Sequence, residues 1–401
     1  TPDNRSTRGE TGEAMTFGEK LRALMAEREI GVRELARLVP CDAGYLSRVR
    51  NGRKPPSDTL AARLDEILGA NGELAALPAA GGTSLDGHDR LRRRLDEVLT
   101  AGAMAEATLD EWEQAVARHG EAARRRPARA LIGDLAADLE DLQDVMGRHR
   151  GASALRRLTR VAAQMSGLMC LTLIKLDDRA AFRRWARTAR TAAREAGDPF
   201  TGSWVLAQEA YGHFYAGDLG EAIHVAQAAQ QAPAPCVGAV LAAALEARAY
   251  SAYGPDAAAR TREALHRAES LLDALPDAQV NASAFGYNEA QLRFHEGNAL
   301  THLSDTAAAW KAQQRALELC PPADYMDRAL TRLDRTLCLA RDGDTAGALE
   351  YATTALAPLT DDQRQGIIAQ RGRDVLAALT PRQRQLPAAR QLGELLTPAG
   401  R

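Results

Sequence analysis

Val32-Arg-Glu-Leu-Ala36 and Tyr45-Leu-Ser-Arg-Val-Arg-Asn-Gly-Arg-Lys-Pro-Pro56 are the two runs that decide how the first part of this chain folds. The first run lies in a short helix that Pro40 ends, because proline has no backbone N–H with which to continue it. The second run predicts another short helix, which begins after the N-cap residue Asp42 and ends at Asn51-Gly52. Two short helices joined by a tight turn are therefore expected.

Two further helices flank this pair, and their apolar residues also recur at helical spacing. One begins near Phe17 and ends at Gly31, and the other begins after Ser57 or Asp58. We expect the four helices to share one core. Its members are Phe17, Leu21, Leu24, Met25, Leu35, Leu38, Val39, Tyr45, Leu46, Val49, Leu60, Leu64, Ile67 and Leu68.

Changes in composition divide the 401 residues into five segments. Residues 1–15 are expected to form a disordered lead-in, and the small helical domain covers 16–77. Residues 78–88, which read Pro-Ala-Ala-Gly-Gly-Thr-Ser-Leu-Asp-Gly-His, are typical of a linker. Charged connecting helices follow over 89–165, and a repeat domain occupies 166–401. Every long segment after the linker has a helical period, so an all-α fold is predicted.

A helix, a Gly-Asp or Ser-Asp turn and a second helix recur in the last part of the chain. Three segments share this pattern, and the alanines at the same place in each, Ala222, Ala309 and Ala348, lie 87 and 39 residues apart. The longer interval holds two units, the second being a helix pair around 238–275, and an earlier unit centres on Ala181. The period of about 40 residues is close to that of paired-helix solenoids, whose units bury their apolar faces by stacking.

The overall composition limits the classes of protein to be considered. A net charge of −2 means that any nucleic-acid-binding patch must be local. The five cysteines are widely spaced and odd in number, so no disulfide framework or zinc site is expected and a reducing cytoplasm fits. No apolar run approaches the roughly 20 residues that span a bilayer, and no apolar signal core is present. Only four of the 51 basic residues are lysines, which suggests a GC-rich, actinobacterial genome.

The run from Val32 to Pro56 resembles the phage-repressor (Cro-like, xenobiotic-response-element-type) helix-turn-helix family. The similarity covers roughly residues 16–70. It rests on Leu-Ala in the second helix, Tyr-Leu-Ser in the third, the Asn-Gly-Arg-Lys-Pro exit and the length of a five-helix domain. The resemblance implies that the second helix crosses the DNA backbone and that the third lies in the major groove. Double-stranded DNA is therefore the expected partner.

The resemblance also implies roles for individual residues. Arg48 is the best candidate for base recognition, because a guanidinium can bind guanine O6 and N7 together. Arg50 stands where the family often has a glutamate paired to the first helix, so that pair is in doubt and Arg50 becomes a candidate phosphate contact. A solvated charged face is the alternative explanation. The candidates are Ala43, Gly44, Ser47 and Arg48 for base edges, Arg33, Arg50, Arg53, Lys54 and the Asn51 backbone N–H for phosphates, and Asp42 beside them.

The later units resemble tetratricopeptide repeats, although they are longer than the 34 residues of that family. By this resemblance the first helix of each unit lines a concave face. Aromatic and amide side chains cluster there, as they do in grooves that bind peptides or small ligands. Ordinary packing between helices is the alternative explanation. The candidate ligand-binding residues are Trp204, Gln208, Tyr211, Tyr215, Glu246, Tyr250, Gln291, Phe294 and Asn298.

A helix-turn-helix followed by such repeats is similar in layout to the peptide-sensing transcription factors of Gram-positive bacteria and to many actinobacterial regulators. The resemblance implies a homodimer whose repeats bind a peptide or small molecule and thereby change the spacing of the two heads. DNA half-sites about one helical turn apart are expected for such a dimer.

The sequence contains no Walker loop, dinucleotide fingerprint, zinc motif or nucleophile elbow, so an enzyme is not expected. His213, His224, His295 and His302 lack metal-ligand spacing, and neither a metal nor a cofactor is expected. The favoured hypothesis is a cytoplasmic, ligand-responsive DNA-binding regulator. An adapter that recruits a protein partner through its repeats is one alternative, and a regulator without a ligand is another.

Overall fold

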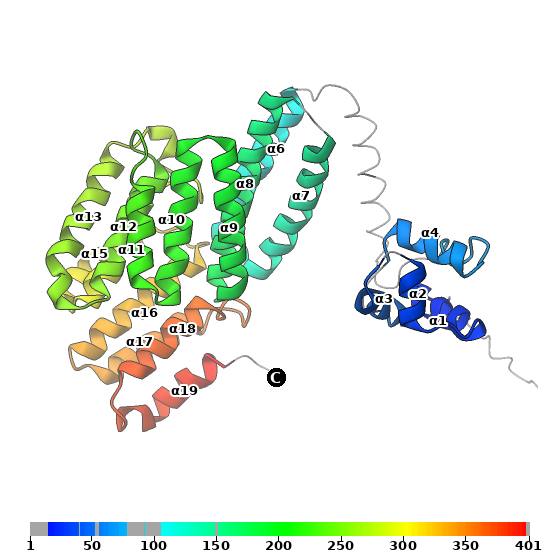
Figure 1. Cartoon of the computed structure of the whole chain (residues 1–401). Coiled ribbons are helices and arrows are strands. Elements are labelled where there is room, and N and C mark those ends of the chain that lie inside the picture. Colours follow the sequence, from blue (N-terminus) through cyan, green and yellow to red (C-terminus); the bar gives the residue numbers. More distant parts are fainter. Residues whose placement is uncertain are drawn as a thin grey trace, which may run out of the picture. The chain divides into compact units, whose positions relative to one another are not determined.

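A computed structural model of the chain (Figure 1) describes residues 15–39, 41–52, 56–77, 92, 106–148 and 151–397. These residues are helical or lie in turns and connections, and they contain no strand. The chain divides into two compact units, Thr1–Gly102 and Ala103–Arg401. The predicted all-α fold, a small helical domain followed by helical repeats, is therefore confirmed. The predicted lead-in 1–15 and linker 78–88 lie almost wholly outside the described residues.

Side chains cap three of the four helices described in the first unit. Thr16 and Glu19 make a capping box at the first helix, and Asp42 Oδ1 accepts the Tyr45 N–H at 2.9 Å at the third. Ser57 caps the fourth helix. Asp42 is thus the N-cap that the sequence predicts. The helices are α1 (Phe17–Glu27), α2 (Val32–Leu38), α3 (Ala43–Arg50) and α4 (Asp58–Ile67).

One apolar face from each of these helices meets in a common core, as predicted. Leu38 is an exception, because it is 52% exposed. Gly18 allows α1 to approach α3 closely, since a Cβ at this position would lie 3.0 Å from the Arg50 carbonyl oxygen. The most deeply buried members of the core include Phe17, Leu21, Leu35, Val39, Leu46, Val49, Leu64, Leu68 and Leu74.

Residues 70–77 form turns after α4, where the length of the resembled family implies a fifth helix. Gly69, Asn71 and Gly72 have φ angles of 53°, 51° and 87°. These left-handed values interrupt helical hydrogen bonding, which explains why no helix forms there.

The carboxylate of Asp65 holds this turn segment against α4. It accepts the backbone N–H groups of Gly72, Leu74 and Ala75 at 2.7, 2.8 and 2.9 Å. Burial on its own raises the pKa of Asp65, but the three N–H donors together outweigh burial and lower it. Asp65 therefore fixes the C-terminal edge of the first unit as a charged acceptor.

Replacing Asp65 with alanine should destabilise the first unit by about 1–3 kcal/mol, because three N–H groups lose their acceptor. Hydrogen exchange of the α4 amides in the full chain measures this change. Glu66→Ala is the matched control, since Glu66 is exposed and its carboxylate pairs with its helix neighbour Arg63. Equal protection in the two variants would show that Asp65 does not hold the turns.

The second unit is a stack of antiparallel helix pairs (Figure 1). The first helices of the pairs contact one another in chain order, and each packs against the helix that follows it. The predicted stack of paired helices is thus observed. The pairs are α8 (Ala152–Lys175) and α9 (Arg179–Ala196), α10 (Pro199–Ala216) and α11 (Leu219–Ala229), α12 (Val237–Ser251) and α13 (Ala258–Asp273), α14 (Glu289–His302) and α15 (Thr306–Leu319), α16 (Tyr325–Arg341) and α17 (Thr345–Leu356), and α18 (Ile367–Ala378) and α19 (Pro387–Leu395).

The turns within the pairs explain the repeated sequence pattern. The residue before the aspartate, Gly217, Ser304 or Gly343, is left-handed, with φ angles of 83°, 62° and 91°. The aspartate that follows is the N-cap of the second helix in each case. Four residues later comes the repeated alanine, and Ala222, Ala309 and Ala348 are all at most 1% exposed. Small buried residues at these positions let the two helices pack closely.

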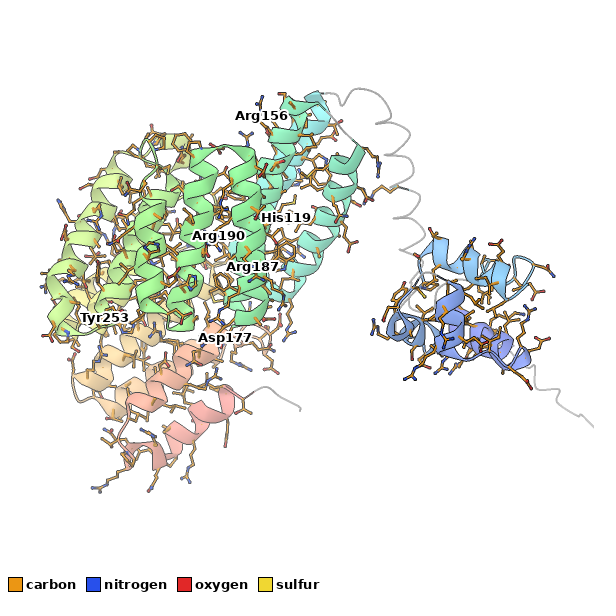
Figure 2. The ribbon with its side chains drawn as sticks, viewed as in Figure 1. His119, Arg156, Asp177, Arg187, Arg190 and Tyr253 are labelled. Carbon is orange, nitrogen blue, oxygen red and sulfur yellow. The ribbon has the colours of Figure 1, made fainter. Side chains whose placement is uncertain are left out.

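Two helices precede the pairs, α6 (Glu106–Arg125) and α7 (Ala128–Arg148). His119 of α6 lies against α7 (Figure 2), with its Nε2 atom 2.6 Å from Asp138 Oδ2. Apolar residues of α6 and α7 belong to the same core as those of the pairs as far as α19. The boundary that the sequence places at residue 165, between connecting helices and repeats, falls inside α8, which continues through it.

Candidate nucleic-acid interface and the interior of the repeat unit

Helix α3 has one buried side and one exposed side. Leu46 and Val49 are buried in the core of the first unit. Gly44 and Arg48 are exposed on the opposite side, and Ala43 and Ser47 are half-buried beside them. The residues predicted to meet base edges therefore lie together, on a surface that short side chains leave accessible.

Arg48 is the one long side chain among these predicted base-reading residues. It extends over Gly44, since a Cβ at Gly44 would lie 3.6 Å from Arg48 Nη1. Among the described residues Arg48 has no ion-pair partner, and α3 carries Arg48 and Arg50 but no acidic residue. Its guanidinium is thus available for a ligand outside the chain.

The predicted phosphate contacts differ in their environment. Arg33 is exposed on α2, and Arg50 is half-buried with its Nε atom lacking a hydrogen-bond partner among the described residues. The Asn51 backbone N–H, proposed as a phosphate donor, instead donates to the Ser47 carbonyl at 3.1 Å and ends α3. Asp42 acts as the helix cap. Arg53 and Lys54 lie outside the described residues.

Comparison with known families agrees with this geometry. Residues 16–77 match the model of a helix-turn-helix domain family. No curated protein matches the chain. Residues 16–77 accordingly form a helix-turn-helix domain, the class of DNA-binding module in which a short helix such as α3 enters the major groove.

Arg48→Ala should weaken binding to a preferred DNA site by about 1–3 kcal/mol and relax base preference, because one bidentate base contact is lost. Fluorescence anisotropy with a selected site and a scrambled duplex measures both effects. Arg63→Ala removes the same charge from the exposed side of α4 and serves as control. Equal loss on both duplexes for Arg48→Ala would contradict a role in base recognition.

The residues predicted to line a ligand groove are mostly used by the chain itself. Trp204 is buried, and its Nε1 donates to the Ala284 carbonyl at 2.8 Å. Its ring lies 4.7 Å from the Phe285 ring, measured between centroids. The connection between α13 and α14, which contains Ala284 and Phe285, therefore covers this part of the predicted face. A hydrogen bond also ties this connection to α6, since the Gly120 carbonyl accepts the Ala284 N–H at 3.0 Å.

Four of the predicted ligand-binding residues surround a buried arginine, Arg248, which was not predicted from the sequence. Arg248 of α12 is 1% exposed, and its guanidinium lies 5.6, 5.3 and 5.4 Å from the ring centroids of Tyr211, Tyr215 and Phe294. It also donates to Asn298 Oδ1 at 2.7 Å and Tyr215 Oη at 3.1 Å. A charged residue inside the apolar run of α12 was the only sequence signal for it. These rings thus pack around a cation of the chain, through cation–π contacts.

Glu246 and Tyr250 take part in a separate network between α11, α12 and α13. Glu246 accepts from Gln227, Gln230 and Arg267 at 2.9, 2.8 and 2.7 Å. Tyr250 accepts from Gln227 at 3.3 Å. The nine predicted ligand residues therefore do not line a single open groove in this structure.

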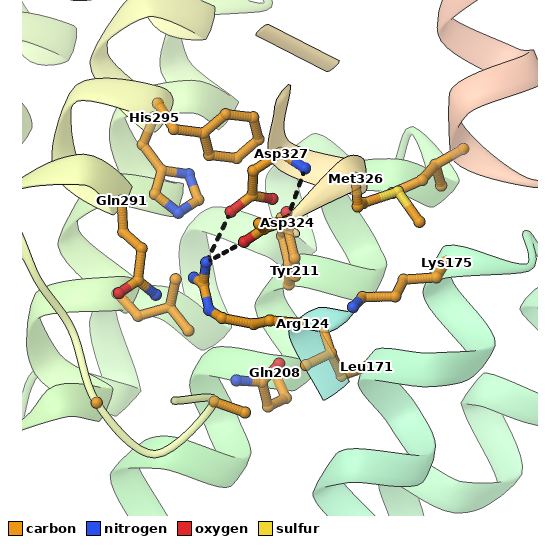
Figure 3. A pocket seen from close by; sticks show the side chains of 15 residues that line it. Arg124, Leu171, Lys175, Gln208, Tyr211, Gln291, His295, Asp324, Met326 and Asp327 are labelled. Carbon is orange, nitrogen blue, oxygen red and sulfur yellow. Dashed lines mark hydrogen bonds and ion pairs between the residues drawn. The ribbon is translucent and has the colours of Figure 1, made fainter. Parts of the chain in front are cut away.

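A small cavity whose wall carries several charged side chains lies where α6, α8, α10, α14 and α16 meet (Figure 3). Arg124 of α6 donates to Asp324 at 2.7 Å and Asp327 at 3.0 Å, both at the start of α16. Lys175 of α8 donates to the Ala123 carbonyl. The cavity measures about 60 Å³, which is room for a few water molecules. Predicted ligand residues on its wall are Gln208, Tyr211, Gln291 and Phe294.

Burial changes the proton affinities of the charges in this cavity. Burial, together with the neighbouring Asp324 carboxylate, raises the pKa of Asp327 to about 6, although Arg124 and Lys175 act in the opposite direction. Burial lowers the pKa of Lys175, and the two aspartates limit this effect. These charges lie between helices that are far apart in sequence, so sequence periodicity did not reveal them.

A larger groove of about 790 Å³ lies next to the cavity and shares Arg124 and Asp324 with it. Its walls are α6, residues 278–285 and the connection before α16. Most of the lining is apolar or small. The lining residues are Ala117, Glu121, Arg124, Arg125, Ala278, Asn281, Ala282, Ser283, Phe285, Pro321, Ala323 and Asp324.

The described residues form neither a membrane-spanning helix nor a metal-binding cluster. No helix among them is long and apolar enough to cross a membrane. No group of three or more His, Cys, Asp or Glu side chains in the described part of the chain is placed to hold a metal ion.

The raised pKa of Asp327 predicts a pH dependence of stability. Its pKa is about 6 in the folded chain and 3.8 ordinarily, so protonation of this carboxyl favours folding. The contribution is fully present below the ordinary value and is lost as the pH rises through about 6. Asp327→Asn should remove this part of the dependence, as measured by urea unfolding from about pH 4 to 7. The exposed substitution Asp361→Asn is the control, and an unchanged slope in Asp327→Asn would refute the assignment.

Proposed function

We propose that this protein is a sequence-specific DNA-binding transcriptional regulator. The observation that carries the proposal is the exposed side of α3, where Arg48 stands without an ion-pair partner among the described residues and its neighbours are short. A guanidinium in this position suits the O6 and N7 atoms of guanine. Arg33 and Arg50 suit the adjacent phosphates, which set the register of the helix on the duplex.

We further propose that the repeat unit forms a homodimer and senses a peptide or small molecule. The groove of about 790 Å³ supports this proposal, since it falls within the size range of small-molecule sites. It differs from the groove predicted from the sequence, because it lies between α6 and residues 278–285. Occupation of this groove changes the position of α6, the first helix of the second unit, and so the spacing of the two heads.

Footprinting of the purified full chain on genomic fragments tests DNA recognition. Two protected half-sites about one helical turn apart are expected, with affinity that falls steeply with salt. Arg48→Ala should abolish the footprint and Arg63→Ala should keep it. Weak, nonselective binding combined with stable capture of a protein partner would favour an adapter instead.

A thermal-shift screen with peptides and metabolites tests the proposed sensing. A ligand of the groove should raise the melting temperature of the wild-type chain. It should not do so for Ala282→Trp, in which an indole fills the groove. Ala180→Trp, which adds the same ring on the exposed side of α9, is the control and should still respond. A ligand that stabilises Ala282→Trp equally would show that the groove is not the sensing site.

A further inference from the structure

Helix α9 carries far more positive charge than the chain as a whole. Its 18 residues include six arginines and one glutamate, whereas the whole chain has a net charge of −2. Arg187 and Arg190 are seen on this helix in Figure 2. These arginines lie neither in the helix-turn-helix domain nor in the lining of the proposed ligand groove.

The buried side of α9 fixes the direction in which the arginines point. Phe182, Ala186, Ala189 and Ala193 are buried against the repeat core. At 100° per residue, five arginines lie within an arc of about 140° on the other side, and all five are exposed. We call this surface the arginine face, and it consists of Arg179, Arg183, Arg184, Arg187 and Arg194.

Most of the charge on the arginine face is not neutralised. Arg179 pairs with Asp177 at 3.1 Å, and Arg183 is 3.3 Å from Asp218. Arg184, Arg187 and Arg194 have no ion-pair partner among the described residues. Elsewhere in the second unit, exposed or half-exposed arginines often pair with carboxylates, as Arg157, Arg267, Arg293 and Arg315 do.

The spacing of these arginines does not help the helix to form. Arg183 and Arg187 are four residues apart, and Arg184 and Arg187 are three apart, so like charges are neighbours on the helix surface. Such pairs destabilise a helix. The fold therefore gains nothing from this arrangement, which points to a ligand that compensates the charge.

The surroundings of the arginine face indicate the class of that ligand. The side chains between the arginines are small, Ala180 and Thr191, and no large apolar residue of α9 is exposed. A protein partner or a membrane surface would need apolar anchors there. A row of guanidinium groups without apolar neighbours instead suits a regular polyanion. From Arg179 to Arg194 the helix rises about 22 Å, which is long enough to contact several phosphates of a duplex.

We infer that the arginine face of α9 binds the phosphate backbone of double-stranded DNA, outside the segment that α3 reads. The inference rests on the proposed function, because the head brings the chain to DNA. Residues 78–105 connect the helix-turn-helix domain of residues 16–77 to α6 and would span at most about 100 Å if fully extended, so both surfaces can reach one duplex. The contact is independent of base sequence and adds affinity through the release of counterions.

The test replaces Arg184, Arg187 and Arg194 together with alanine in the full chain. Salt titrations by fluorescence anisotropy use mixed-sequence duplexes of about 15 and about 50 base pairs, the shorter one being just sufficient for a head. On the longer duplex, the slope of log affinity against log salt should fall in magnitude by about 3, since three phosphate contacts are lost. On the shorter duplex the slope should stay the same.

Two matched variants control for charge and folding. Arg260, Arg382 and Arg390 are exposed elsewhere on the second unit, and their triple replacement with alanine removes the same charge without a change in slope. Replacement of the three α9 arginines with lysine should keep the wild-type slope, because lysine also binds phosphate as a point charge. Circular dichroism melting should not be lowered in any variant, since all these positions are exposed.

An unchanged slope of the α9 alanine variant on the longer duplex would overturn the inference. So would an equal loss on both duplexes, or an equal loss in the control triple variant. Failure of the proposed function is seen separately, because the wild-type chain would then bind a selected site and a scrambled duplex equally. If only the inference fails, Arg48→Ala still removes sequence preference while the α9 variant binds as the wild type does.

Discussion

Arg124 links two distant parts of the second unit, because its guanidinium on α6 pairs with Asp324 at the start of α16 across 200 residues of sequence. In a stack of helix pairs, each pair mainly contacts the pairs next to it in the chain. Arg124 adds a contact between helices that are distant in the chain, and Lys175 donates a hydrogen bond to the adjacent Ala123 carbonyl. Because these charges are buried, loss of one partner leaves the other uncompensated, which is far more costly than loss of a surface pair.

Local patterns made part of the fold predictable. Asp42 before an apolar run predicts an N-cap, and a left-handed Gly217 before Asp218 ends one helix and starts the next. Such features act within a few residues of chain. Arg124, Asp327 and Arg248 could not be assigned in this way, because their partners come from other helices. Periodicity placed Tyr211, Tyr215 and Phe294 on the first helices of their pairs, but it did not show that the Arg248 guanidinium lies between their rings.

The candidate DNA surface shows the same division between local and distant information. Arg48 on α3 follows from helical spacing alone, since Leu46 and Val49 must face the core. The hydrogen-bond partner of the Asn51 N–H does not follow from spacing, because only the structure shows that this group donates to Ser47 in the last turn of α3. The arginine face of α9 is visible in the sequence as a run of charge. Its meaning depends on the absence of acidic partners for Arg184, Arg187 and Arg194 among the described residues, which the sequence cannot give.

The long separation between Arg124 and Asp324 has a consequence for synthesis on the ribosome. At about 5–20 residues per second, α6 is complete some 10–40 s before α16 is made. During that interval Arg124 has been made, but the carboxylates of Asp324 and Asp327 that pair with it have not. The ion pair between α6 and α16 forms only after α16 is made, so a truncated product that ends before Asp324 keeps its N-terminal domain yet lacks this contact.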